Sequence, residues 1–204
     1  MKTVGKFACF LFVLAGYALA QSRLQSGPPT AGLGSSFDVG AGYSYLTTSI
    51  PGAGRVNLGG VDVTSHADFS ERWGATVDAG YVRTSDVLAT GNSGYVLTFL
   101  GGPVFYPFEH GKTRIFVHAL VGAGLVDSAV PTTGNNYLHG WVARYAYAAG
   151  GGVERSVAGP FAVRFSGDYL RTAFVDSSDV VQLQNNLRVT ASVVFRLRDR
   201  HSTR

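Results

Sequence analysis

The sequence predicts an all-β fold, an eight-stranded antiparallel up-and-down transmembrane β-barrel. Three observations lead to it: about eight segments in which apolar and polar residues alternate, charges that fall mostly on one side of that alternation, and an unusual composition. The chain has 204 residues, of which 27 are glycine, 12% are aromatic and only 15% are charged. Soluble domains carry roughly 25% charged residues. The length suits a single domain.

Residues 1–20 have the pattern of a secretion signal peptide. Lys2 and Lys6 give a positive start, an apolar run follows, and Ala18-Leu19-Ala20 is a small-x-small cleavage site. The apolar run is shorter than the roughly 18 to 20 residues that a membrane-spanning helix needs. Cys9, the one cysteine, lies inside this segment. We therefore expect a mature chain without disulfides, thiol catalysis or cysteine metal sites.

The rest of the chain divides into three parts. Residues 21–36 are rich in glycine, proline and serine and predict a flexible linker. Residues 37–198 form the expected outer-membrane β-barrel, and residues 199–204 a short basic tail. The sequence has no second apolar run long enough for a membrane helix. A secreted apolar chain of this kind is either a soluble β domain or a barrel that meets lipid with alternate residues.

Alternation with a period of two runs through the barrel segment. It is clearest at 37–45, 61–69, 75–81, 161–172 and 187–197. This period is typical of strands that bury or expose one apolar face. Glycine pairs and triplets interrupt it in three further segments, as expected where a strongly curved barrel brings backbones together.

The connections are predicted to differ between the two ends of the barrel. Short ones are expected near 70–72, 108–112 and 156–160. Longer polar ones are expected at 47–57, 84–94, 127–140 and 173–184. Short periplasmic turns and long external loops are typical of outer-membrane barrels whose N- and C-termini both lie in the periplasm.

Most strand charges fall on even-numbered positions, opposite to the odd-numbered apolar ones. The exceptions, Arg83, Arg155 and Arg171, lie near predicted strand ends. A basic residue facing lipid at the bilayer midplane costs about 2–4 kcal/mol, so this placement suits a barrel with its charges inside. A soluble β domain would show the same segregation with the apolar side inward. Aromatics near strand ends and small residues on the polar parity favour the membrane barrel. The charged positions are Asp38, Asp62, Asp68, Asp78, Arg114, Arg144, Glu154, Arg164, Asp168, Arg188 and Arg196.

Seven of these charges are the candidate site, a salt-bridge network that plugs the lumen. Buried charges must be paired or hydrated, and a symmetric hairpin around 173–184 would bring Asp168 opposite Arg188. The interior of an eight-stranded barrel is just filled by side chains, which favours a plug over the gate of a small ion pore. The network comprises Asp38, Asp62, Asp78, Arg144, Arg164, Asp168 and Arg188.

Several function classes are disfavoured by what the sequence lacks. The formal net charge is +4, but no Lys/Arg-rich block that would bind nucleic acid occurs. His66 and His118 fall on the inward parity without a metal-ligand spacing. A Ser-His pair facing lipid is therefore disfavoured. No phosphate-binding glycine motif is present, and we expect neither cofactor, metal nor catalytic residues.

Four segments of the chain resemble a known family, the small bacterial outer-membrane β-barrel proteins related to the OmpA transmembrane domain. The resemblance implies the fold and the compartment, and little about activity, since that family includes anchors and adhesins. It covers essentially the whole mature chain and is clearest from about residue 97 onward. The segments are GGPVFYPFEHGKTRIFVHALVGAG (101–124), the triple glycine at 150–152, FAVRFSGDYLRTAF (161–174) and QNNLRVTASVVFRL (184–197).

The last strand resembles the carboxyl-terminal signal that the outer-membrane assembly machinery reads. Thr190, Ser192, Phe195 and Leu197 occupy its polar, small, aromatic and terminal hydrophobic positions. It departs from the pattern in having Ser192 where glycine is usual, and in the tail that follows the strand.

The expected protein is a monomer with a structural, anchoring or surface-interaction role and a plugged lumen. Its expected partners are outer-membrane lipid, lipopolysaccharide and the assembly machinery. Two alternatives remain open: an enzyme that modifies lipid or lipopolysaccharide, and a narrow ion-conducting pore.

Overall fold

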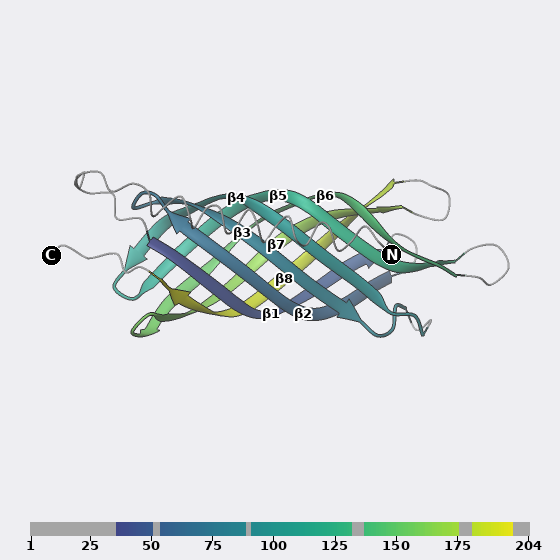
Figure 1. Cartoon of the computed structure of the whole chain (residues 1–204), viewed down its shortest axis with the longest axis horizontal. Helices are drawn as coiled ribbons and strands as arrows, with labels where there is room; N and C mark the ends of the chain where they lie inside the picture. The colour runs from purple at the N-terminus through teal and green to yellow at the C-terminus, as the bar shows by residue number, and fades with distance from the viewer. Residues whose placement is uncertain (1–35, 51–53, 89–90, 132–136, 176–180, 198–204) are drawn as a thin grey trace, which may run out of the picture. The chain divides into compact units, whose positions relative to one another are not determined.

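Eight segments of alternating sequence form eight antiparallel strands, which close into one barrel (Figure 1). Each strand pairs with the next along the chain, and β8 pairs back onto β1. The computed structural model describes residues 36–50, 54–88, 91–131, 137–175 and 181–197. The strands are β1 (Ser36–Ile50), β2 (Gly54–Asp68), β3 (Trp73–Thr84), β4 (Gly94–His110), β5 (Thr113–Pro131), β6 (Tyr137–Ala158), β7 (Phe161–Val175) and β8 (Val181–Arg196). The predicted fold class is confirmed.

The hydrogen-bonded ladder begins at Ser36 and ends at Arg196, close to the predicted span 37–198. The predicted signal peptide lies outside the described residues, as do almost all of the linker and the basic tail. Among the described residues, no helix has the length and apolar character needed to span a bilayer.

The apolar side of each strand faces outward. In β8, Leu187 is 56% exposed and Val193 57%, whereas Arg188 is 3% exposed. Along most of each ladder, even-numbered residues pair with even-numbered ones and odd with odd. The even-numbered side chains therefore point inward around the whole barrel. This arrangement is the reverse of a soluble sandwich, which would bury the apolar side.

Aromatic side chains form outward-facing contacts near both ends of the strands. At the end with the shorter connections, Trp73 lies 4.8 Å from Phe105, and Phe161 lies 5.4 Å from Phe195, between ring centroids. Tyrosines occupy the other end of the outer surface, Tyr43, Tyr45, Tyr81, Tyr95, Tyr147 and Tyr169 among them. The side chain of Trp141, placed in this band by the sequence, lies outside those that are described. Two such bands are typical of a barrel that crosses both interfaces of a bilayer.

The inner half near the longer connections contains an apolar cluster, which the sequence analysis did not anticipate. The signal was present as adjacent apolar residues near strand ends, such as Tyr45-Leu46 and Tyr81-Val82, where both faces of the strand are apolar. The buried residues are Leu46, Val56, Leu58, Val82, Val96, Leu100, Leu120, Val126, Ala146, Ala148 and Leu170. They pack against one another inside this half of the barrel.

The prediction of four long loops is confirmed for 84–94 and wrong in extent for the other three. Strands continue into these polar segments, so that β1 and β2 are separated only by residues 51–53, and β5 and β6 by 132–136. Polar residues extend the ladders because pairing satisfies their backbone donors and acceptors. The longest connection is 85–93, and the opposite turns are as short as 111–112.

Candidate functional site

Arg188 of β8 is the centre of one ionic cluster inside the barrel. Its Nη1 and Nη2 donate to the two carboxylate oxygens of Asp78 in β3, at 2.8 and 3.1 Å. Its Nε and Nη2 donate to Oδ2 of Asp168 in β7, at 3.0 and 2.8 Å. Asp62 in β2 lies 3.4 Å from Nη1. One guanidinium thus ties four strands across the lumen, and the register places Asp168 opposite Arg188, as the sequence predicts.

His118 of β5 extends this cluster. Its Nε2 lies 2.7 Å from Oδ1 of Asp168, so both oxygens of that carboxylate are engaged. The other ring nitrogen, Nδ1, is buried and has no hydrogen-bond partner among the described residues. The pair therefore links β5 to β7.

Arg164 of β7 is the centre of a second cluster, nearer the short turns. It bonds to Glu154 through Nε at 2.9 Å and also through Nη2, and to Asp38 through Nη2 at 3.0 Å. Arg196 donates to the other oxygen of Glu154 at 2.6 Å. Arg164 Nη1 also donates to Thr64 at 3.2 Å. These contacts tie β1, β2, β6, β7 and β8 together.

A third contact group lies beside the second. Arg114 of β5 donates to Oδ2 of Asp68 at 2.9 Å, and Ser36 donates to the same oxygen at 2.7 Å. The Arg114 guanidinium lies 3.8 Å from the centroid of the Tyr106 ring, a cation–π contact. The Tyr106 hydroxyl lies 3.3 Å from Nδ1 of His66, and His66 Nε2 lies 3.1 Å from Arg164. The second and third groups are thus continuous.

Acidic groups outnumber guanidinium groups in this interior. Burying a charge is costly unless it is paired and hydrogen-bonded, and each of these side chains has at least one ionic contact. Removing one member of a buried pair is strongly destabilising, because the other is left uncompensated. The carboxylates are Asp38, Asp62, Asp68, Asp78, Glu154 and Asp168, and the guanidinium groups Arg114, Arg164, Arg188 and Arg196.

Glycines on the inner face make room for the two central arginines. A Cβ at Gly80 would lie 2.9 Å from Thr98 Oγ1, 3.2 Å from Asp62 Oδ2 and 3.4 Å from Arg188 Nη1. A Cβ at Gly40 would lie 2.8 Å from Thr64 Oγ1. A larger residue at Gly80 would therefore crowd the Asp62–Arg188 contact, and one at Gly40 would crowd Thr64.

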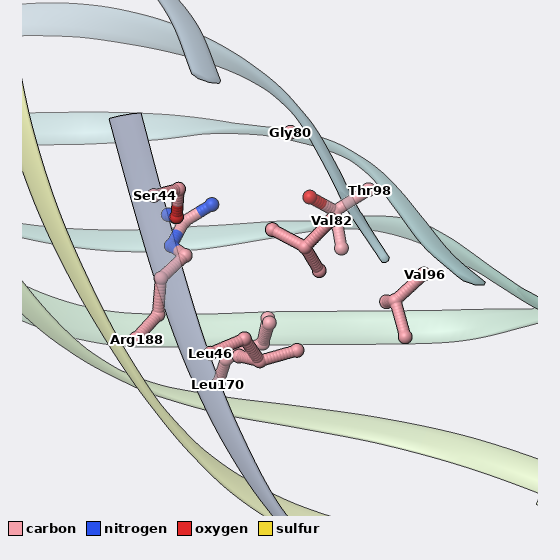
Figure 2. A pocket seen from close by; sticks show the side chains of 8 residues that line it. All are labelled: Ser44, Leu46, Gly80, Val82, Val96, Thr98, Leu170 and Arg188. Atoms are coloured by element: carbon pink, nitrogen blue, oxygen red, sulfur yellow. The ribbon is translucent and has the colours of Figure 1, made fainter. Parts of the chain in front are cut away.

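One cavity marks the boundary between the Arg188 cluster and the apolar inner half. Figure 2 shows Arg188 and Ser44 on one side of it, and Val82 and Val96 on the other. Its volume is about 10 Å³, roughly the space of a single water molecule. It offers no room for a ligand larger than water.

Six of the seven predicted network residues lie in these clusters, and Arg144 does not. Arg144 is exposed, and its Nη1 donates to the carbonyl of Ala143 at 3.0 Å. It lies on β6 beyond Tyr147, where the ladder with β7 ends. Its even residue number puts it on the inward face of the strand, but it lies outside the closed part of the barrel. Asp68, Arg114, Glu154 and Arg196, which the strand parity also placed inward, complete the clusters.

The four predicted assembly-signal residues lie on both sides of the last strand. Thr190 is buried, and its hydroxyl bonds to Ser44 at 3.2 Å; Ser192 stands opposite Gly42. Phe195 and Leu197 face outward and are 41% and 56% exposed. The two apolar members of the signal are therefore on the surface.

Comparison with solved structures finds similar folds. The attachment invasion locus protein Ail of Yersinia pestis matches with a TM-score of 0.58 at 16% identity, over 81% of this chain and 100% of Ail. Neisserial surface protein A matches with 0.62 at 13%, over 79% and 98%. The outer membrane protein OprG of Pseudomonas aeruginosa matches with 0.51 at 9%, over 82% and 98%.

No protein-family model matches the sequence, and no curated protein does. Within the described part of the chain, no group of three or more histidine, cysteine or acidic residues could hold a metal ion. The identities of the structural matches are low, so the likeness concerns the fold. The chain has the fold of the small eight-stranded β-barrels of the bacterial outer membrane.

Proposed function

We propose that this chain is an integral outer-membrane protein whose plugged barrel serves as an anchor for surface interactions. Its short turns and both termini face the periplasm, and the opposite strand ends face outward from the cell. The observation that carries this proposal is the inverted arrangement of the barrel, with apolar side chains outside and ionic clusters inside.

The outer surface supports residence in lipid. Val121 is 65% exposed and Phe165 57%, and similar residues surround the barrel. A soluble protein rarely exposes a continuous apolar surface of this size. In a bilayer, the same surface faces the lipid acyl chains and needs no covering partner.

The interior supports an anchor in preference to a pore. An ion entering from the turn end would meet the buried clusters of Arg164 and Arg188. Beyond them, it would meet the packed apolar cluster that includes Leu46, Leu100 and Leu170. Both layers would have to rearrange before the lumen could conduct.

A non-catalytic role is part of the proposal. A lipid-modifying hydrolase would need a Ser-His pair at the lipid surface. His66 and His118 lie inside the barrel, and within the described residues their hydrogen-bond partners are Tyr106, Arg164 and Asp168. The histidines thus act as members of the ionic clusters.

The proposed partners are outer-membrane lipid, lipopolysaccharide and the assembly machinery, with the barrel acting as a monomer. The outward position of Phe195 and Leu197 supports reading of the last strand by that machinery. Ail has been solved in complex with the heparin analogue sucrose octasulfate. A binding site for sulfated glycans is not part of the proposal for this chain.

Two measurements test this function. The folded protein, run unboiled on a gel, should migrate differently from the boiled sample and should fractionate with outer membranes. In planar bilayers it should give no single-channel currents. Recovery from the soluble periplasmic fraction would contradict the membrane assignment, and steady currents would contradict the plug.

A further inference from the structure

The charges inside the barrel are unevenly divided between its ionic clusters. Near the short turns, three guanidinium groups face three buried carboxylates among the described residues, so these charges balance. In the Arg188 cluster, one guanidinium faces the three carboxylates of Asp62, Asp78 and Asp168. His118, the other titratable member, adds at most one positive charge. At least one negative charge is therefore in excess there. The balanced set is Arg114, Arg164, Arg196, Asp38, Asp68 and Glu154.

This excess charge has little access to water. Asp62, Asp78 and Asp168 are only 2%, 3% and 2% exposed. The cavity beside Arg188 holds about 10 Å³, and none of the three carboxylates lines it (Figure 2). Within the described part of the chain, no side-chain group could bind a compensating metal ion. A buried carboxylate without a counter-charge takes up a proton instead, because that removes the cost of burying the charge.

The hydrogen bonds of Arg188 indicate which carboxyl group carries the proton. A guanidinium has five N–H groups to donate. Asp78 accepts on both of its oxygens, at 2.8 and 3.1 Å. Asp168 accepts twice on Oδ2, and its Oδ1 contacts His118. Asp62 has one contact, with Nη1, and at 3.4 Å it is the longest in the cluster. A negative charge is therefore stabilised least on Asp62.

Asp62 also has a carboxylate acceptor within reach. In the β2–β3 register, Asp62 pairs with Gly80 and Asp78 pairs with Thr64, so the two carboxyl groups are diagonal neighbours on the inner face. Oδ2 of Asp62 and Oδ1 of Asp78 both contact Nη1 of Arg188, and the two side chains are within hydrogen-bond reach of each other. Two carboxyl groups form a hydrogen bond only when one is protonated, because an ionised carboxylate has no donor.

We propose that Asp62 is protonated in the folded barrel and donates a hydrogen bond to ionised Asp78. When the pH is raised, Asp62 releases this proton to water, and two negative charges then repel each other beside one guanidinium. The Arg188 cluster is thus a pH-sensitive element of the barrel. It lies in the folded interior and is independent of the anchor role and of the orientation in the membrane.

Infrared spectroscopy of the full chain tests the proposal, with the barrel folded at neutral pH in a detergent that has no carbonyl group. The parent should show the carbonyl stretch of a protonated carboxyl group, and Asp62→Asn should abolish it. Asp86→Asn is the matched control, since Asp86 is exposed and asparagine keeps the oxygen that accepts from the Gly91 N–H. It should leave the band unchanged. A parent without the band, or a band that survives Asp62→Asn, overturns the proposal.

Urea unfolding at increasing pH is the second readout. The folded barrel holds a proton that Asp62 releases in the unfolded chain, so a higher pH favours unfolding. Relative to Asp62→Asn, the parent's unfolding equilibrium constant should rise by up to about tenfold per pH unit, until the folded barrel also loses the proton. Asp86→Asn should follow the parent. A ratio between parent and Asp62→Asn that does not change with pH overturns the proposal.

Unboiled gel mobility checks that each variant is folded. If Asp62→Asn does not fold, the parent alone still decides the question. Its carboxyl band should disappear as the pH is raised, over the same range in which its stability falls. A band that persists while the stability falls overturns the proposal.

Discussion

Single residues show how closely the side chains inside the barrel fit together. Arg188 meets three carboxylates and Arg164 meets two, and a glycine beside each arginine leaves the space for its guanidinium. The sequence predicted that these charges would lie inside the barrel, and that the hairpin around 173–184 would bring Asp168 opposite Arg188. Which carboxylate each arginine selects could not be predicted, because that depends on contacts across the lumen between strands distant in sequence.

Gly80→Ala tests that fit. The added methyl would meet Thr98 and the Arg188–Asp62 contact, so we expect a loss of about 1–3 kcal/mol in the free energy of unfolding. Gly167→Ala is the matched control, because a Cβ there meets nothing within 4 Å; it should be neutral or stabilise by up to about 1 kcal/mol. Urea titration in lipid vesicles measures both. Equal effects of the two substitutions would refute the steric argument.

At the scale of elements, the period of two predicted the strands and which residues share a face. Strand ends were predicted less well, because polar residues near 47–57 and 127–140 continue the ladder once a partner strand is present. For the same reason Arg144 was placed in the lumen, although its strand extends beyond the closed part of the barrel. Local alternation predicts which face of the strand a residue lies on, but not where along the barrel axis it lies.

Arg188→Ala tests the role of the ionic ties between strands. It leaves Asp62, Asp78 and Asp168 without their shared cation, so we expect a loss of about 3–5 kcal/mol in the free energy of unfolding. Arg83→Ala, at an exposed strand end, should stay within about 0.5 kcal/mol of the parent. Urea unfolding followed by tryptophan fluorescence measures both. A small loss for Arg188→Ala would mean that the cluster contributes little to holding the strands.

For the whole molecule, closing the sheet into a barrel gives its two faces different surroundings. A closed barrel leaves no free edge along its membrane-spanning part, so the outer residues can face acyl chains while the inner charges pair across a narrow lumen. The sequence indicated this inverted arrangement through its aromatic bands and small inward residues. It did not indicate the apolar cluster inside the barrel near the longer connections, because those residues resemble an outward face when each strand is considered alone.

The most direct test of the inverted barrel is the accessibility of nitroxide labels on single cysteines. Val121→Cys on β5 and Val193→Cys on β8 place labels at positions that are 65% and 57% exposed. In lipid vesicles, both labels should be relaxed strongly by dissolved oxygen, which concentrates in the bilayer, and weakly by an aqueous nickel chelate. Strong relaxation of both by the nickel chelate would show that these residues face water, and would contradict the account.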